Sequence, residues 1–190
     1  AFGFAALARR RLGKEWLGAI RGWTLVAWLL LGAGNLIGMW WAYVELGWGG
    51  YWAWDPVENA GLMPWLIATA FLHSILIQRR LNMFKWWSMI LIVATFSLVI
   101  FGTFLTRSGF LSSVHTYGVS AMGPYFIVFL ALVIIGSIIL LVARRHDLKS
   151  DGEVEQLISR EGTFLIANLL FVGSTLVIFF GTLSPAFSEL

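Results

Sequence analysis

Residues 125–142 read YFIVFLALVIIGSIILLV, a run of 18 residues that contains no charged side chain. As an α-helix this run would be about 27 Å long, which approaches the roughly 30 Å thickness of the hydrocarbon core of a membrane. The composition of the whole chain agrees, since 59% of its 190 residues are hydrophobic and only 12% are charged. A soluble domain of this size could not bury so much apolar surface and still cover itself with polar groups. The sequence therefore predicts an integral membrane protein.

Four more stretches have the length and hydrophobicity of a membrane span. They lie at residues 22–43, 63–78, 86–104 and 163–183, and the run quoted above belongs to a fifth span over 125–143. None of the five alternates polar and apolar residues as the strands of a membrane β-barrel do. We therefore expect an all-α, polytopic membrane helix bundle with five transmembrane helices and a Trp-rich loop or amphipathic helix at its outer surface.

The segments between the spans complete the expected organisation. Residues 1–21 are expected to be the end of a preceding helix and a basic loop, 44–62 and 105–124 to be loops, and 144–162 to be a polar linker. Because the chain begins with Ala and opens on a short apolar segment, we expect it to be part of a longer protein.

The basic residues indicate how the spans are oriented. Of the 13 Lys and Arg residues, all except Arg107 lie before the first span, between the second and third, or between the fourth and fifth. Connections rich in Lys and Arg stay on the cytoplasmic side of a membrane. Loops 44–62 and 105–124 are therefore expected to face outward, into the periplasm of a bacterium or the equivalent compartment at a mitochondrial inner membrane.

Charge and cysteine content argue against several other classes of protein. The net charge is only +3 and the basic residues are dispersed among apolar runs, which disfavours a nucleic-acid partner. Because the chain has no Cys, it has no thiol for redox chemistry, disulfides or metal binding. Motifs for a catalytic nucleophile, a phosphate loop or a metal box are also missing from the sequence.

The most informative stretch runs from Trp40 to Trp65 and holds six of the 11 Trp residues. Trp and Tyr favour the headgroup layer of a membrane, so an interfacial belt explains part of this enrichment. Three glycines, Gly47, Gly49 and Gly50, lie among the aromatic residues and allow a ligand to approach the backbone closely. Indole rings also stack on planar aromatic ligands. The stretch is therefore open to two interpretations, a membrane belt or an aromatic platform for such a ligand.

The motif Asp55-Pro-Val-Glu58 follows the aromatic residues and predicts the start of a helix. Asp at the N-cap, Pro at the first helical position and Glu at the third form a capping box. This helix is expected to continue into the span at 63–78.

Two blocks of the sequence resemble a known family. The first, WGGYWAWDPVENA over residues 48–60, is similar to the tryptophan-rich WWD signature of haem-handling membrane proteins in cytochrome c maturation. The second, GTFLTRSGFLSSVH over residues 102–115, is similar to the segment after the next helix in the CcmF haem lyase family. Because both blocks match in order, the chain resembles CcmF more closely than the CcmC haem-delivery or CcsA-type synthetase families.

The resemblance implies that two histidines bind haem iron. His73, inside the second span, is similar in position to the axial ligand of a b-type haem, whose second ligand would lie outside this chain. His115, after the third span, is similar in position to one of two periplasmic ligands of the incoming haem. From the residues alone, two alternatives stay open: His73 bonded to a neighbouring helix, and His115 solvated in a loop.

Other residues of the two blocks are implied in the same site. Trp48, Trp52 and Trp54 would support the face of the haem, and Arg107 would bind a propionate, with a headgroup or helix-end contact as the alternative. For Asp55, the simplest interpretation is that it caps the helix. The alternatives are that it belongs to the cofactor-binding site or that it acts as an acid or base.

The reaction implied by the resemblance is covalent attachment of haem to apocytochrome c. Haem arrives on the periplasmic haem chaperone CcmE, and its vinyl groups form thioethers with a Cys-x-x-Cys-His segment. A CcmH-type, thioredoxin-like subunit presents the apocytochrome, and a membrane haem b is the reductant. The implied cofactors are thus haem b and haem as substrate, and the surroundings include membrane lipid.

Two other functions stay open at this point. A haem-binding or delivery protein of the CcmC or CcsA type would bind haem without a ligation step of its own. A membrane transporter subunit belongs to a different class, although the span interiors hold few ionisable residues for an ion path.

Overall fold

The computed structural model describes residues 2–10, 13–116, 120–150 and 159–188 of the chain. Its helices are α1 (Phe2–Arg9), α2 (Lys14–Glu45), α3 (Pro56–Leu81), α4 (Lys85–Ser108), α5 (Gly123–Ala143) and α6 (Arg160–Ser188). These described ranges contain no β-strand. Each of the 5 helices α2 to α6 is long and apolar enough to cross a membrane. The predicted all-α membrane bundle is therefore confirmed.

The helices extend beyond the hydrophobic spans predicted from the sequence. Segment 1–21 was expected to end in a basic loop, but α1 is followed within a few residues by α2, which begins at Lys14. Likewise α3 begins at Pro56, so the part of segment 44–62 between helices is only 46–55. Polar and charged residues at a helix end lie in water without ending the helix, so hydropathy marks the apolar part of a helix rather than its full length.

The other two predicted connections are also shortened by their neighbouring helices. Helices α4 and α5 take up both ends of the predicted loop 105–124, and α6 takes up the end of the linker 144–162. Residues 117–119 of the loop and 151–158 of the linker lie outside the described ranges.

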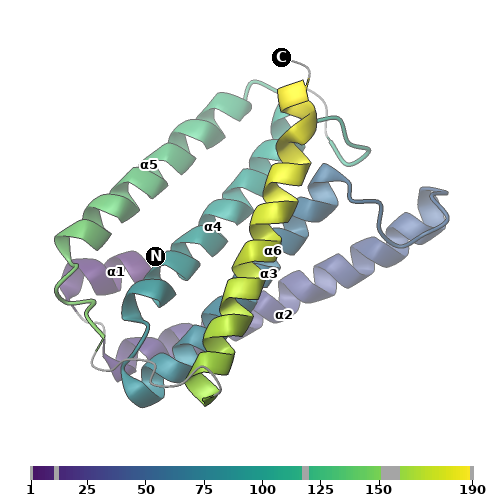
Figure 1. The fold of residues 1–190 in the computed structure, drawn as a ribbon. Coiled ribbons are helices and arrows are strands. Elements are labelled where there is room, and N and C mark those ends of the chain that lie inside the picture. Colours follow the sequence, from purple (N-terminus) through teal and green to yellow (C-terminus); the bar gives the residue numbers. More distant parts are fainter. Residues whose placement is uncertain (1, 11–12, 117–119, 151–158, 189–190) are drawn as a thin grey trace.

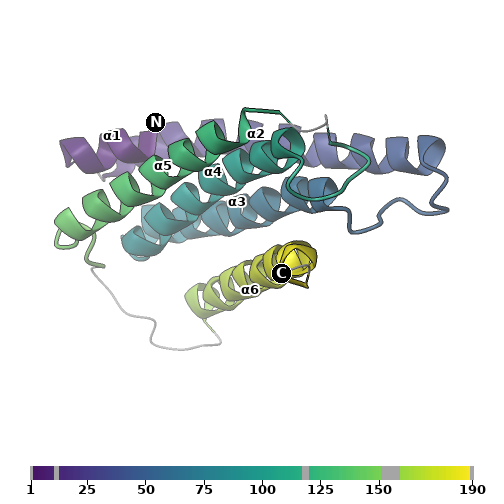
Figure 2. The ribbon, with the colours of Figure 1, turned by 90° about the horizontal axis from the view of Figure 1, so that it is seen from above.

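Helix α3 lies at the centre of the bundle (Figure 1). It packs against α2, α4 and α6, whereas α5 packs against α4, and the short α1 contacts α5, α2 and α4. Figure 2 shows α2 and α6 on opposite sides of α3. A site built on α3 can therefore draw side chains from most of the other helices.

Small and polar residues allow the neighbouring helices to approach α3. A Cβ atom at Gly102 of α4 would lie only 3.1 Å from the Cβ of Ala60 on α3, so the two backbones meet closely here. On the α6 side, Asn168 Nδ2 donates to Ser74 Oγ at 2.8 Å in a fully buried contact. On the α2 side, Asn35 donates to a backbone carbonyl of α3 at 3.3 Å. Close approach of small residues and interhelical hydrogen bonds are how helices associate in lipid.

The outer surfaces of the bundle are apolar. Helices α2 and α5 in particular expose large aliphatic side chains, among them Leu30, Leu36, Ile37, Leu132 and Ile139. Such an exterior suits contact with lipid tails or with other membrane helices.

The two ends of the bundle carry different segments. At one end, Arg144 Nε, after α5, donates to Leu7 O of α1 at 3.2 Å, which joins two of the basic segments. At the opposite end lie the α2–α3 connection, with its Trp residues, and the α4–α5 connection, with His115 (Figure 1). These two connections are far apart in sequence but lie at the same end of the molecule.

Candidate functional site

The candidate site is built on the first turn of α3. Asp55 is the N-cap residue, and its Oδ2 accepts a hydrogen bond from the backbone N–H of Val57 at 2.9 Å. Glu58 Oε2 accepts from the backbone N–H of Asp55 at 3.3 Å and from that of Ala53 at 3.0 Å. With Pro56 in the first turn, this is the capping box that the motif predicts, and that prediction is confirmed.

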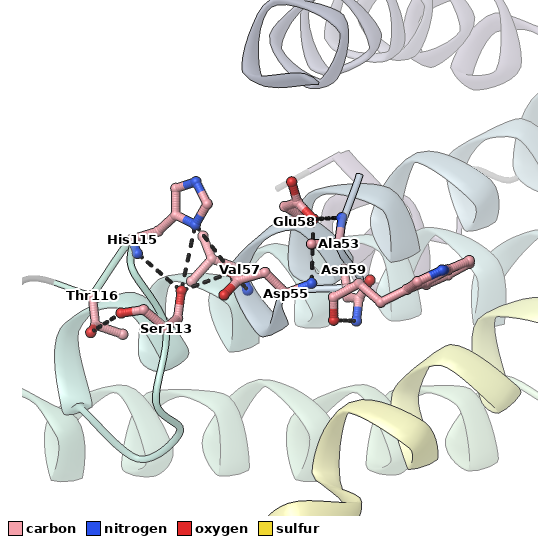
Figure 3. Close-up of polar contacts among 9 residues, drawn as sticks. Ala53, Asp55, Val57, Glu58, Asn59, Ser113, His115 and Thr116 are labelled. Carbon is pink, nitrogen blue, oxygen red and sulfur yellow. Dashed lines mark hydrogen bonds and ion pairs between the residues drawn. The ribbon is translucent and has the colours of Figure 1, made fainter. Parts of the chain in front are cut away.

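The same carboxylate oxygen of Asp55 also contacts the α4–α5 connection (Figure 3). His115 Nδ1 lies 3.1 Å from Asp55 Oδ2, and the hydroxyl of Ser113 donates to that oxygen at 2.7 Å. Both side chains are largely enclosed, with 22% exposure for His115 and 10% for Asp55. One oxygen therefore joins the N-terminus of α3 to a loop 60 residues further along the chain.

Two tryptophans lie beside the ring of His115. The centroid of the imidazole is 5.4 Å from that of Trp41, in the last turns of α2, and 6.2 Å from that of Trp48, in the α2–α3 connection. Neither ring stacks flat on the imidazole, since the interplanar angles are 54° and 69°. His115 thus has a carboxylate on one side and indole rings on another.

This arrangement suits a histidine that binds a metal ion. An ionised carboxylate can only accept hydrogen bonds, so a hydrogen bond between it and the facing Nδ1 atom requires the hydrogen on Nδ1. In a neutral imidazole with that hydrogen, the lone pair lies on Nε2, which points away from Asp55 in Figure 3. Histidine ligands to metals are commonly oriented by a carboxylate in this way. Among the described residues, three or more metal-ligating side chains do not gather at one point, so an iron atom here would need further ligands from elsewhere, such as a porphyrin.

Trp52 and Trp54 lie apart from His115 and contact each other edge to face, with ring centroids 6.2 Å apart. They border a groove of about 800 Å³ between α2 and α3. At the inner end of this groove, the indoles of Trp28 and Trp65 stack at 5.4 Å. The predicted aromatic platform is therefore divided, with Trp48 beside His115 and the other two tryptophans along the groove.

Trp54 has an unusual backbone conformation directly before the cap. Its φ angle is +59°, in the left-handed region that a bulky residue seldom adopts. Asn59 Nδ2 donates to the Trp54 carbonyl at 2.9 Å and to Thr182 Oγ1 of α6 at 3.0 Å. Asn59, which is buried, thus holds the strained residue in place from the first turns of α3.

Arg107 lies exposed in the last turn of α4, at the same end of the bundle as His115. Its backbone carbonyl accepts from Ser120 Oγ at 2.7 Å. This bond joins the end of α4 to the residues that lead into α5.

His73 lies far from this cluster, in the interior of α3. It is 8 residues before the end of the helix at Leu81, which corresponds to about 12 Å along the axis. Its imidazole faces α6, with ring centroids 5.2 Å from Phe164 and 5.8 Å from Phe171. Its Nδ1 atom is buried and has no hydrogen-bond partner among the described residues. The described residues therefore do not meet the hydrogen-bonding requirement of this nitrogen.

The sequence alone does not identify two residues of this site, Trp41 and Ser113. Trp41 belongs to the aromatic stretch but precedes the 48–60 block, and Ser113 is one of several serines in the 102–115 block. Spacing along the chain alone does not distinguish either residue from its neighbours. Ser113 reaches the site through the fold of its own connection, and Trp41 reaches it because that connection packs against the end of α2.

Comparisons with known proteins agree with this picture. A family model described as cytochrome c assembly protein matches residues 6–112. The chain is 46% identical over its whole length to the cytochrome c-type biogenesis protein CycK of Bradyrhizobium diazoefficiens. It is 47% identical over 97% of its length to the cytochrome c-type biogenesis protein CcmF of Pseudomonas aeruginosa. It spans only 29% and 28% of these two relatives, respectively.

A solved structure, the cytochrome c haem lyase CcmF, matches the whole chain with a TM-score of 0.79 and 39% sequence identity. The match covers 28% of that structure. The resemblance inferred from the two sequence blocks is thereby confirmed, and the chain belongs to the family of cytochrome c assembly proteins, with CcmF among its relatives.

Proposed function

We propose that this chain is the haem-binding part of a cytochrome c haem lyase, which attaches haem covalently to apocytochrome c. The observation that supports this most directly is the position of His115, whose ring is held by Asp55 beside Trp41 and Trp48. The family and the names of its relatives point to the same process.

The outer site would receive haem as substrate. His115 would bind the iron through Nε2, and Trp41 and Trp48 would pack against the porphyrin near that ligand. Trp52 and Trp54, along the neighbouring groove, would extend the aromatic surface, and Arg107 would bind a propionate from the end of α4. A second axial ligand would come from outside this chain.

His73 would bind a second haem, of the b type, within the membrane. In support of this role, His73 lies inside the apolar part of α3, and its buried Nδ1 has no hydrogen-bond partner among the described residues, a state that costs about 1–3 kcal/mol for a buried polar atom. The aromatic rings of Phe164 and Phe171 provide an apolar environment on the α6 side. Such a haem would supply an electron to the outer site.

The composition of the chain indicates which reacting groups would come from the substrate. The chain contains no Cys, so the sulfur atoms that form the thioether bonds belong to the Cys-x-x-Cys-His segment of the apocytochrome. The residues of the outer site would hold the haem still, orient it and exclude water, which are the contributions of proximity and orientation to the rate.

The proposed function predicts which compartment each end of the bundle faces and which proteins it meets there. The α2–α3 and α4–α5 connections would face the periplasm, where the haem chaperone CcmE delivers haem and a CcmH-type subunit presents the apocytochrome. The basic end of the bundle would face the cytoplasm, as the distribution of Lys and Arg indicates.

Replacement of His115 by Ala in the complete protein tests this proposal. We expect the variant to lose covalent attachment, measured by haem staining of a c-type cytochrome after electrophoresis. His146→Ala, at the basic end of the bundle, is the matched control and should attach haem as the unmodified protein does. Normal attachment by His115→Ala would refute the proposal, whereas haem delivery without covalent product in the unmodified protein would favour a CcmC-type function.

A further inference from the structure

We propose that Asp55 and Ser113 are positioning residues that fix the orientation and tautomer of His115, so that Nε2 is the atom presented to iron. This inference rests on the proposed function of the outer site. It assigns Asp55 a role through His115 rather than in contact with haem, and it assigns a role to Ser113 that the sequence does not indicate.

Three groups meet at a single oxygen atom of Asp55. Oδ2 accepts from the backbone N–H of Val57 at 2.9 Å and from Ser113 Oγ at 2.7 Å, and it lies 3.1 Å from His115 Nδ1. The first two contacts hold the carboxylate in one orientation, so the third is aimed at a fixed point. The hydroxyl hydrogen of Ser113 is directed to Asp55, so it is not available for the longer, 3.5 Å contact between Ser113 Oγ and His115 Nδ1.

The loop that carries His115 is held by the same serine. The backbone N–H of His115 donates to Ser113 Oγ at 3.0 Å, and Thr116 Oγ1 donates to Ser113 O at 2.8 Å. Ser113 therefore fixes both the backbone of His115 and the carboxylate that faces its ring (Figure 3). Because Asp55 caps α3, the imidazole is anchored to the central membrane helix and not merely to its own loop.

A carboxylate behind a ligating imidazole has two effects. It selects the tautomer with hydrogen on Nδ1, and it makes the opposite nitrogen a stronger donor to the metal. Loss of such a second partner typically weakens metal binding by about 10–100-fold. The same loss should leave the fold intact if the replacement still caps the helix.

The matched pair of variants is Asp55→Asn and Glu58→Gln. Asn is as good an N-cap residue as Asp, so Asp55→Asn keeps the cap and removes the charge that faces His115. Glu58→Gln removes an equal charge from the same capping box, but Glu58 bonds to the backbone of Ala53 and Asp55 and not to His115. Ser113→Ala removes the second contact without altering α3.

The first measurement is a titration of the complete, purified protein with ferric haem, followed by the change in Soret absorbance. We expect Asp55→Asn to raise the dissociation constant about 10–100-fold, Ser113→Ala to raise it less, and Glu58→Gln to change it by less than about twofold. Equal effects of Asp55→Asn and Glu58→Gln would overturn the proposal, because they would indicate a general effect of charge or helix capping.

The second measurement does not depend on haem. Solid-state NMR of the haem-free protein labelled with ¹⁵N-histidine reports which ring nitrogen carries hydrogen, and the signal of His115 is identified by its loss in His115→Ala. We expect hydrogen on Nδ1 alone in the unmodified protein and a mixture of tautomers in Asp55→Asn. Hydrogen on Nε2 in the unmodified protein would refute the positioning role. If the tautomer is as expected but His115→Ala binds and attaches haem normally, the proposed function fails, and with it the presentation of Nε2 to iron, whereas the orientation of His115 by Asp55 still holds.

Discussion

The imidazole of His73 on α3 and the ring of Phe164 on α6 lie 5.2 Å apart, at an interplanar angle of 47°. This contact places His73 at the interface of the central helix with the last helix of the chain. The Nδ1 atom of His73 is buried and has no hydrogen-bond partner among the described residues. The contact with Phe164 therefore encloses the ring without supplying a hydrogen bond. The interface therefore leaves a polar nitrogen in the interior of the bundle without a hydrogen bond from the described residues.

We expect His73→Ala to remove the proposed b-type haem from the complete protein, because an axial nitrogen ligand would be lost. The measurement is the haem content of the purified protein by the pyridine haemochrome method, together with its reduced-minus-oxidised spectrum. His146→Ala should retain both. A b-type spectrum of normal intensity in His73→Ala would place the membrane haem elsewhere.

The tryptophans of the signature should differ in their effect on haem binding. Trp48 lies 6.2 Å from His115, whereas Trp54 is 63% exposed and contacts Trp52 instead. Loss of one aromatic pair costs about 0.5–1.5 kcal/mol, so Trp48→Ala should weaken haem binding at the outer site about two- to tenfold. Trp54→Ala should weaken it less, in the same Soret titration. A larger effect of Trp54→Ala would indicate that haem occupies the groove between α2 and α3.

Much of the fold could be predicted because it depends on properties that are local in sequence. The apolar run at 125–142 requires a helix in lipid whatever surrounds it, and the capping box at Asp55 depends only on residues within one turn. The ends of the helices were less predictable. Hydropathy reports which residues prefer lipid, and helices such as α2 continue into water beyond that point.

The candidate site could be predicted only in part, for the opposite reason. His115 and Asp55 are each recognisable, but their contact spans 60 residues and depends on how the α4–α5 connection folds over the start of α3. The separation of Trp48 from Trp54 could not be predicted either, because Trp48 contacts His115 of the α4–α5 connection whereas Trp54 contacts Trp52. Contacts of this kind follow from packing rather than from a local pattern.

Asn59 should be important for stability because it restrains the strained conformation of Trp54. Asn59→Ala would leave the Trp54 carbonyl without its donor and would also break the bond to Thr182, at an expected cost of about 1–3 kcal/mol. Thr182→Val removes the interhelical bond, which is typically worth about 0.6 kcal/mol in a membrane, together with the bond from Thr182 Oγ1 to Ile178 O within α6, but it leaves the bond to the Trp54 carbonyl in place. Unfolding of the purified variants in SDS, followed by Trp fluorescence, measures both. Equal destabilisation by the two substitutions would show that the restraint on Trp54 contributes nothing.

The absence of Cys from this chain allows its orientation to be measured with single cysteines introduced at exposed positions. Ser112→Cys lies in the α4–α5 connection and Lys149→Cys at the basic end, and both native side chains are exposed. The excess of Lys and Arg at that end should keep it in the cytoplasm. In intact spheroplasts of cells that carry the complete protein, with cysteines outside this chain replaced, a membrane-impermeant maleimide should label Ser112→Cys. It should label Lys149→Cys only after lysis. The reverse pattern would place His115 in the cytoplasm, where it could not receive haem for a periplasmic cytochrome.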